Sequence, residues 1–163
     1  MSSLNPYEKY LDGRPPEAIL ASTTEQLRAL IEAIGPEKTA VRPAPGKWSP
    51  AEILCHLADC ELVFGFRLRQ TLAEDAPTIQ PFDQEKWAET YPAISADEAL
   101  ATFSAFRKWN LLLIAGALPA AANRPVTHPE RGPMTFRTIV DTMAGHDLNH
   151  LAQLQTLAAS AVS

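Results

Sequence analysis

Histidines are the residues of this sequence best suited to metal chemistry, and two of the four stand one helical turn apart. Between Phe136 and Leu157 apolar residues recur at steps of three or four, and His146 and His150 continue that stripe. Positions i and i+4 of a helix lie on one face. Both imidazoles can therefore bind one ion from the same side.

A third histidine lies on a separate apolar face. That face has members at helical spacing, namely Ile53, His56, Cys60 and Phe64. A buried imidazole carries polar nitrogens that need a partner, and one divalent ion would satisfy three such rings at once. We predict that His56, His146 and His150 hold one divalent metal ion. The alternative is that each is an ordinary core histidine bonded to a neighbouring group.

Three neutral imidazoles would leave the charge of the ion uncompensated, so the site would favour an anionic ligand at an open position. Hydroxide from bound water would give hydrolysis. A substrate thiolate would give thiol transfer or isomerisation. The sequence shows no positioned general base, and a thiolate mechanism does not require one because coordination itself makes the nucleophile. Zinc, nickel and iron all suit three imidazoles. A non-catalytic metal-binding stress-response bundle and a metal-free helical module are the alternatives.

Caps and prolines delimit the elements that must position these histidines. Capping boxes are predicted at Ser49–Glu52 and Ser95–Glu98. Four long helices are predicted over about 17–34, 49–73, 95–118 and 135–159, with a short helix near 83–91. No alternating segment of strand length competes. We therefore predict an all-α fold, a four-helix bundle with long proline-rich loops, as one domain over residues 1–163. In an up-and-down bundle the second and fourth long helices would run parallel.

Several short motifs also resemble the DinB-like (DinB/YfiT-like) family, over about residues 20–157. The motifs are PGKWS at 45–49, Glu52, HLAD at 56–59, Arg107, HPERG at 128–132 and HDLNHLAQ at 146–153. The resemblance implies a four-helix bundle with a three-histidine divalent metal site, and His56, His146 and His150 fill its positions. Family members include transferases and isomerases that use bacillithiol, mycothiol or glutathione. The resemblance therefore also implies a thiol-dependent activity of one of these two kinds. A low-molecular-weight thiol is therefore the expected small-molecule partner.

Two further residues could join the site. His128 precedes the last long helix, and in an up-and-down bundle its loop would share the metal end with the loop of Trp48. It would help to bind substrate or shuttle protons there, or it would simply pack against proline. Cys60 lies one turn after His56, but a small buried residue is the commoner use of cysteine, so we leave it out of the ligand set.

Three charged residues near the inner faces of the predicted helices are interpreted as structural rather than catalytic. Asp147 follows a predicted ligand but lies about 100° around the helix from it, so we expect it behind the site or on the surface. Arg67 and Arg107 need carboxylate partners if they are buried, and Asp59 or Glu61 could serve; otherwise they reach towards water. For Arg107 the family resemblance favours a structural ion pair near the pocket.

Composition excludes several classes of protein. The chain has 163 residues and a formal net charge of −5, with no long basic block, so we expect no nucleic-acid partner. The longest apolar run, 111–118, is too short for a bilayer. No signal peptide is evident, which favours the cytoplasm. The two cysteines, Cys55 and Cys60, fall in one predicted helix and are expected to be reduced thiols. A homodimer is compatible with the sequence.

Overall fold

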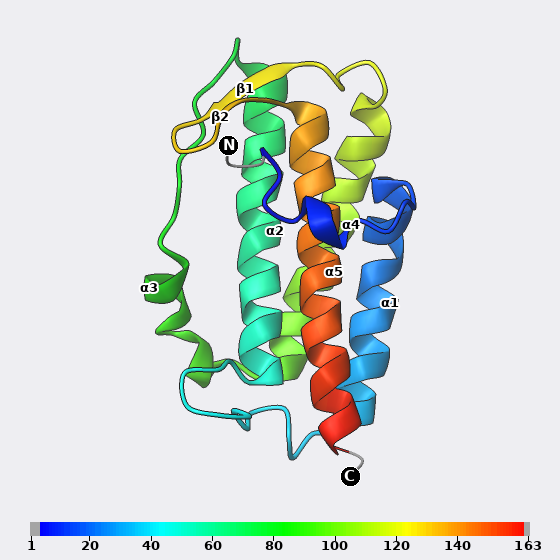
Figure 1. Ribbon diagram of the computed structural model, residues 1–163, viewed down its shortest axis with the longest axis vertical. Helices are drawn as coiled ribbons and strands as arrows, with labels where there is room; N and C mark the ends of the chain where they lie inside the picture. The colour runs from blue at the N-terminus through cyan, green and yellow to red at the C-terminus, as the bar shows by residue number, and fades with distance from the viewer. Residues whose placement is uncertain (1–3, 162–163) are drawn as a thin grey trace.

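The computed structural model describes residues 4–161, and within them four long helices lie side by side (Figure 1). They are α1 (Pro16–Ile34), α2 (Pro50–Ala73), α4 (Ala96–Ala117) and α5 (Phe136–Ala161). The predicted all-α four-helix bundle is confirmed, with helix ends close to those expected. The predicted single domain covers residues 1–163, so its two ends lie outside the described residues. The N-terminal segment, which was expected not to be a signal peptide, also begins outside them.

Local sequence explains where these helices begin. Ser49 Oγ accepts a hydrogen bond from the Glu52 N–H at 3.2 Å, and the Glu52 carboxylate accepts one from the Ser49 N–H at 2.7 Å. Ser95 and Glu98 form the same reciprocal pair at the start of α4. Both predicted capping boxes are therefore confirmed, and each satisfies N–H groups that the first helical turn leaves unpaired. At the C-terminal end of α1, Gly35 adopts a φ of +84°, a backbone conformation that glycine adopts more easily than other residues.

Helix direction differs from the prediction. α1 and α5 run one way, and α2 and α4 run the other way (Figure 1). The connection over residues 74–95, which carries α3 (Gln84–Ala88) and the 3-10 turn η2 (Tyr91–Ala93), returns along the bundle from the end of α2 to the start of α4. It is long enough to span α2, which measures roughly 36 Å. The expectation of parallel histidine helices was therefore wrong, because α2 and α5 are antiparallel.

A small β-hairpin replaces part of the predicted loop between α4 and α5. β1 (Pro125–His128) pairs antiparallel with β2 (Gly132–Thr135). The start of the long connection adds to this hairpin, since the Ile79 N–H donates to the Thr127 carbonyl at 2.9 Å. The sequence analysis did not predict these two strands. Each strand has four residues, too few for a clear period of two, and prolines in both obscure the pattern.

Two apolar clusters fill the bundle, with a polar layer between them. One cluster includes Leu54, Phe103 and Leu154, and the other includes Phe136 and Met143. Buried polar residues lie among them, namely His56, Glu61, Arg107, His146, Asp147 and His150, all at most 5% exposed. None of the helices in the described chain is both long and apolar enough to cross a membrane.

Candidate metal centre

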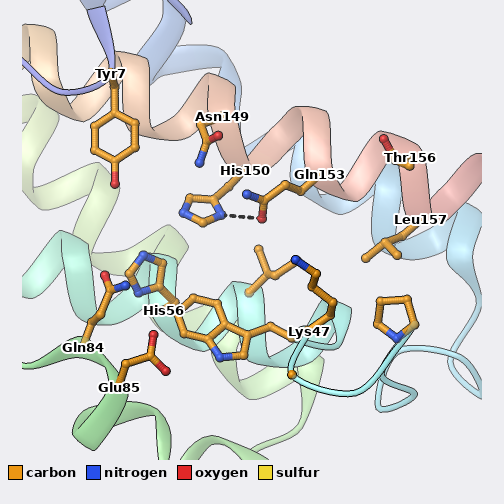
Figure 2. Close-up of a pocket in the computed structure, with 14 residues that line it drawn as sticks. Tyr7, Lys47, His56, Gln84, Glu85, Asn149, His150, Gln153, Thr156 and Leu157 are labelled. Atoms are coloured by element: carbon orange, nitrogen blue, oxygen red, sulfur yellow. Dashed lines mark hydrogen bonds between the residues drawn. The ribbon is translucent and has the colours of Figure 1, made fainter.

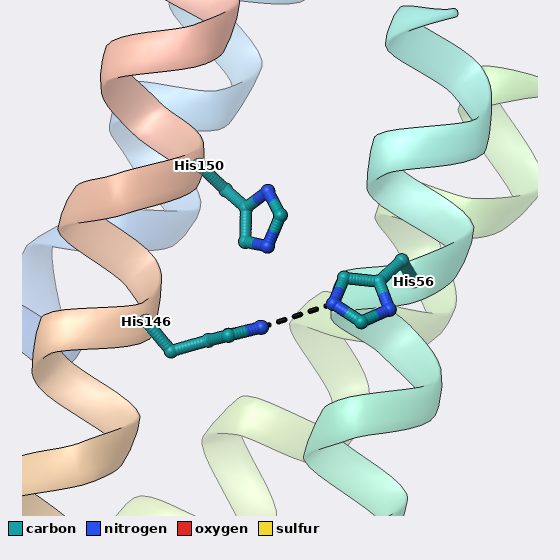
Figure 3. Close-up of side chains that lie close together, drawn as sticks. All are labelled: His56, His146 and His150. Atoms are coloured by element: carbon teal, nitrogen blue, oxygen red, sulfur yellow. Dashed lines mark hydrogen bonds between the residues drawn. The ribbon is translucent and has the colours of Figure 1, made fainter. Parts of the chain in front are cut away.

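The structure brings the three predicted histidines together. His56 comes from α2, and His146 and His150 come from successive turns of α5, so that the three rings face one another between the two helices (Figure 3). The Nε2 atoms of His56 and His146 are 3.0 Å apart. One ring nitrogen from each histidine lies within 4.8 Å of the other two. Helical periodicity thus located a real cluster.

The spacing of these nitrogens fits one divalent ion. Ligand nitrogens at 2.0–2.1 Å from a tetrahedral zinc ion are separated by about 3.3 Å. The observed separations, from 3.0 Å to at most 4.8 Å, bracket that value. The cluster can therefore hold a metal ion, whereas the ligand role of each histidine is a proposal.

The protonation state of the rings also suits metal binding. Burial and, to a lesser extent, the neighbouring His150 lower the pKa of His56 to about 3. Burial, followed by the two other histidines, holds the pKa of His146 well below its ordinary value. Burial likewise lowers the pKa of His150. All three imidazoles are neutral near pH 7, so each offers a free lone pair.

Gln153 orients one of the rings. His150 Nδ1 lies 3.1 Å from Gln153 Oε1, one turn further along α5. A neutral ring donates from Nδ1 to this amide oxygen, and its Nε2 then carries the lone pair. A partner of this kind fixes both tautomer and orientation of a metal-binding histidine.

Cys60 lies beside the cluster without belonging to it. Its Sγ is 3.6 Å from Nε2 and 3.8 Å from Nδ1 of His56, so it is close to both ring nitrogens. The group of described residues that can share one ion consists of the three histidines. Burial raises the pKa of the Cys60 thiol, which keeps it protonated and a poor ligand.

A cavity of about 580 Å³ opens beside His56 and His150 (Figure 2). Three parts of the chain line it besides α2 and α5: the N-terminal segment, the loop before α2, and α3. Besides the two histidines, its polar and aromatic lining comprises Tyr7, Lys47, Trp48, Gln84, Glu85, Asn149, Gln153 and Thr156. Sequence analysis missed Tyr7, Gln84 and Glu85, because they lie in short segments outside the four long helices. The cavity gives small molecules access to the histidine cluster.

A buried ion network lies behind the cluster. Arg107, only 2% exposed, donates to Glu61 Oε1 at 2.7 Å and to Asp147 Oδ2 at 2.6 Å. The predicted ion pair of Arg107 is confirmed, with Glu61 as one partner. Asp59 instead accepts a hydrogen bond from the Tyr91 hydroxyl at 2.8 Å. Asp147 is 2% exposed, so of the two places expected for it, the surface is excluded.

His128 and Arg67 lie apart from the cavity. His128 belongs to the hairpin, at the opposite end of the bundle from the loop of Trp48 (Figure 1). The predicted shared end was wrong because α2 and α5 are antiparallel. The Glu130 N–H donates to His128 Nδ1 at 3.2 Å. Arg67 is buried without an ion pair among residues 4–161, and it donates to the Gln80 carbonyl at 2.8 Å.

The fold and the site together define a class of protein: a helical bundle with two parallel helix pairs, whose buried three-histidine cluster opens into a polar cavity. The chain belongs to the DinB superfamily, whose family model matches residues 19–154. The family resemblance stated from the motifs is thereby confirmed.

Three proteins with similar sequences share one name. A protein of Oceanobacillus iheyensis is 29% identical over 113 residues, covering 69% of this chain and 66% of the relative. One of Bacillus mycoides is 26% identical, covering 69% and 65%. One of Geobacillus kaustophilus is 26% identical over 145 residues, covering 86% and 80%. All three are named "putative metal-dependent hydrolase". The chain thus spans just under two thirds of the length of the first two.

A solved structure supports the fold. YfiT from Bacillus subtilis superposes with a TM-score of 0.81, over 89% of this chain and 85% of that protein, at 20% sequence identity. It is described as "a probable metal-dependent hydrolase with an unusual four-helix bundle topology". At this level of identity the likeness shows the shared fold.

Proposed function

We propose that this protein is a metal-dependent enzyme that transfers a low-molecular-weight thiol to an electrophile, with one zinc, nickel or iron ion held by His56, His146 and His150. The observation that carries the proposal is the convergence of three neutral imidazoles beside an open cavity. A divalent ion bound there would lower the pKa of a coordinated nucleophile and so supply it in anionic form.

The nucleophile has to come from the substrate side. Burial raises the pKa of Cys55 to about 11 and also raises that of Cys60. Both thiols are therefore protonated and enclosed, which makes them poor nucleophiles. An external thiol would find its activating group at the histidine cluster, because coordination by itself favours the thiolate.

The cavity walls suit such a substrate. Its volume of about 580 Å³ falls within the roughly 300–1,000 Å³ of small-molecule sites. Lys47 supplies a positive charge, and the side-chain amides of Gln84, Asn149 and Gln153 supply donors and acceptors. These groups would hold the carboxylates and amides of bacillithiol, mycothiol or glutathione, the thiols that the family resemblance implies.

Hydrolysis is the second candidate, favoured by Glu85. Its carboxylate lines the cavity from α3 (Figure 2). A carboxylate in that place can accept a proton from an attacking water, a role for which the sequence offered no residue. The names of the relatives point to the same reaction class.

A paired assay separates the two reactions. Metal-loaded protein is mixed with each thiol and a chromogenic electrophile, and in parallel with a panel of esters and amides. A thiol-dependent rate that disappears in His56→Ala supports the proposal. His128→Asn is the matched control, because it removes a histidine at the far end of the bundle and keeps an acceptor for the Glu130 N–H.

The opposite outcome is equally informative. Metal-dependent ester or amide hydrolysis without any thiol-dependent rate would favour the hydrolase, and Glu85→Gln should then lower that hydrolysis. A protein that binds metal but is silent in both assays would favour the non-catalytic metal-binding bundle.

A further inference from the structure

The N-terminal segment places Tyr7 beside the histidine cluster. The Tyr7 ring stands edge-on to the ring of His146, with centroids 5.1 Å apart. Tyr7 also lines the cavity, and its hydroxyl points towards His56 and His150 (Figure 2). Tyr7 lies outside residues 19–154, the part matched by the family model.

Several contacts fix the backbone around Tyr7. Its N–H donates to Asn5 Oδ1 at 2.9 Å, and its carbonyl accepts from the Tyr10 N–H at 2.9 Å. The segment also lies directly against α5 at Gly145. A Cβ at that glycine would be 2.6 Å from the Tyr7 carbonyl oxygen and 2.8 Å from the Tyr7 Cβ. The close approach of Tyr7 to α5 thus requires glycine at position 145.

The Tyr7 hydroxyl has no hydrogen-bond partner among the residues that the structure describes. A tyrosine hydroxyl is protonated near pH 7 and is available as a donor. Because the Tyr7 hydroxyl points into the cavity beside the histidines, we expect its hydrogen-bond acceptor to be a molecule bound in that cavity.

We propose that Tyr7 donates a hydrogen bond to the ligand that occupies the open side of the three-histidine centre. The proposal rests on the metal centre of the proposed function. This ligand would be a small anion or a substrate group. The atom bound to the ion would carry a free lone pair that accepts the hydrogen bond from Tyr7. Tyr7 would act as a binding residue that orients this ligand.

Azide binding to the cobalt-loaded protein tests the proposal. Cobalt(II) reports ligand exchange through its visible absorption, and azide is a small anion with lone pairs. We expect Tyr7→Phe to keep the cobalt content and the thermal midpoint of the wild type. Its azide affinity should fall about tenfold, as for the loss of a hydrogen bond to a charged group. Tyr10→Phe is the matched control, since Tyr10 is the neighbouring tyrosine, with ring centroids 6.3 Å apart, and lies outside the cavity lining.

A second variant tests the position of the segment. Gly145→Ala places a methyl group against Tyr7, so azide affinity should fall as in Tyr7→Phe while cobalt is retained. Azide affinity that is unchanged in Tyr7→Phe would overturn the role of Tyr7 and leave the metal centre intact. A wild-type protein that takes up no cobalt would overturn the metal centre and the role of Tyr7 together.

Discussion

Arg107 of α4 donates two hydrogen bonds, of 2.6 and 3.0 Å, to Asp147 of α5, the residue directly after His146. The same guanidinium donates to Glu61 of α2 at 2.7 Å. It also donates to the Leu20 carbonyl of α1 at 2.9 Å, so one buried cation ties together all four long helices, including both helices that carry the histidine cluster. The network therefore links α2 to α5 through Arg107, next to the histidine cluster.

Breaking this network should be costly for stability. Arg107→Met leaves two buried carboxylates without their cation, and we expect the free energy of unfolding to fall by about 3–5 kcal/mol. Arg137→Met is the control, because its pairings with Glu17 and Asp141 involve side chains that are 31% to 38% exposed. That variant should lose about 1 kcal/mol or less. Denaturant unfolding measures both, and equal losses would contradict the role given to Arg107.

Metal content is the direct test of the ligand set. Protein purified without chelators should carry about one transition-metal ion per chain, and His150→Ala should lose it, since two imidazoles hold the ion far less firmly than three. His128→Asn should keep the wild-type content. Elemental analysis gives the stoichiometry. A wild-type protein without metal, or a full complement of metal in His150→Ala, would argue against the site.

The orientation of His150 should depend on Gln153. Gln153→Leu removes the partner of Nδ1, and we expect metal affinity to fall by roughly 10–100-fold. Gln155→Leu changes an exposed glutamine of the same helix that lies outside the cavity lining. Competition with a metallochromic chelator compares the two variants. Similar affinities would show that Gln153 has no orienting role.

Acid stability should depend on Glu52. Hydrogen bonds from Arg42, with Nε 2.9 Å from Oε2, lower the pKa of Glu52 from its ordinary value of 4.5. The ionised carboxylate therefore stabilises the fold above about pH 4.5, and this stabilisation is lost as pH falls through the lower pKa of the folded state.

Glu52→Gln keeps the shape of the capping box and removes the charge. The wild type should be more stable than this variant near neutral pH, and the difference should shrink as the solution is acidified. Urea unfolding between about pH 3 and about pH 7 measures it. Glu25→Gln, at a side chain that is 83% exposed, is the control. A difference that stays constant with pH would contradict the prediction.

The sequence was sufficient to locate the helices and the histidine cluster because both rest on local signals. Ser49 and Ser95 mark helix starts through capping boxes, which depend on neighbouring residues alone. His56, His146 and His150 are placed by helical periodicity, which specifies the buried face wherever the helices lie in space.

Helix direction and the cavity walls needed the structure. Nothing in residues 74–95 signals that the chain returns the length of the bundle before α4 begins, so the parallel arrangement expected for the histidine helices was wrong. Tyr7 and Glu85 reach the cavity from short or irregular segments, where periodicity carries no information. The extent of the domain and the ligand role of each histidine remain predictions.

The pairing of α1 with α5 has a consequence for folding kinetics. Thr23 of α1 hydrogen bonds to Asp147 of α5 at 2.6 Å, across a sequence separation of 124 residues. An up-and-down bundle forms its helix contacts mainly between neighbours along the chain, which closes short loops first. Here the first helix meets its main partner only after the last helix has been made. We therefore expect this protein to fold more slowly than an up-and-down bundle of the same length.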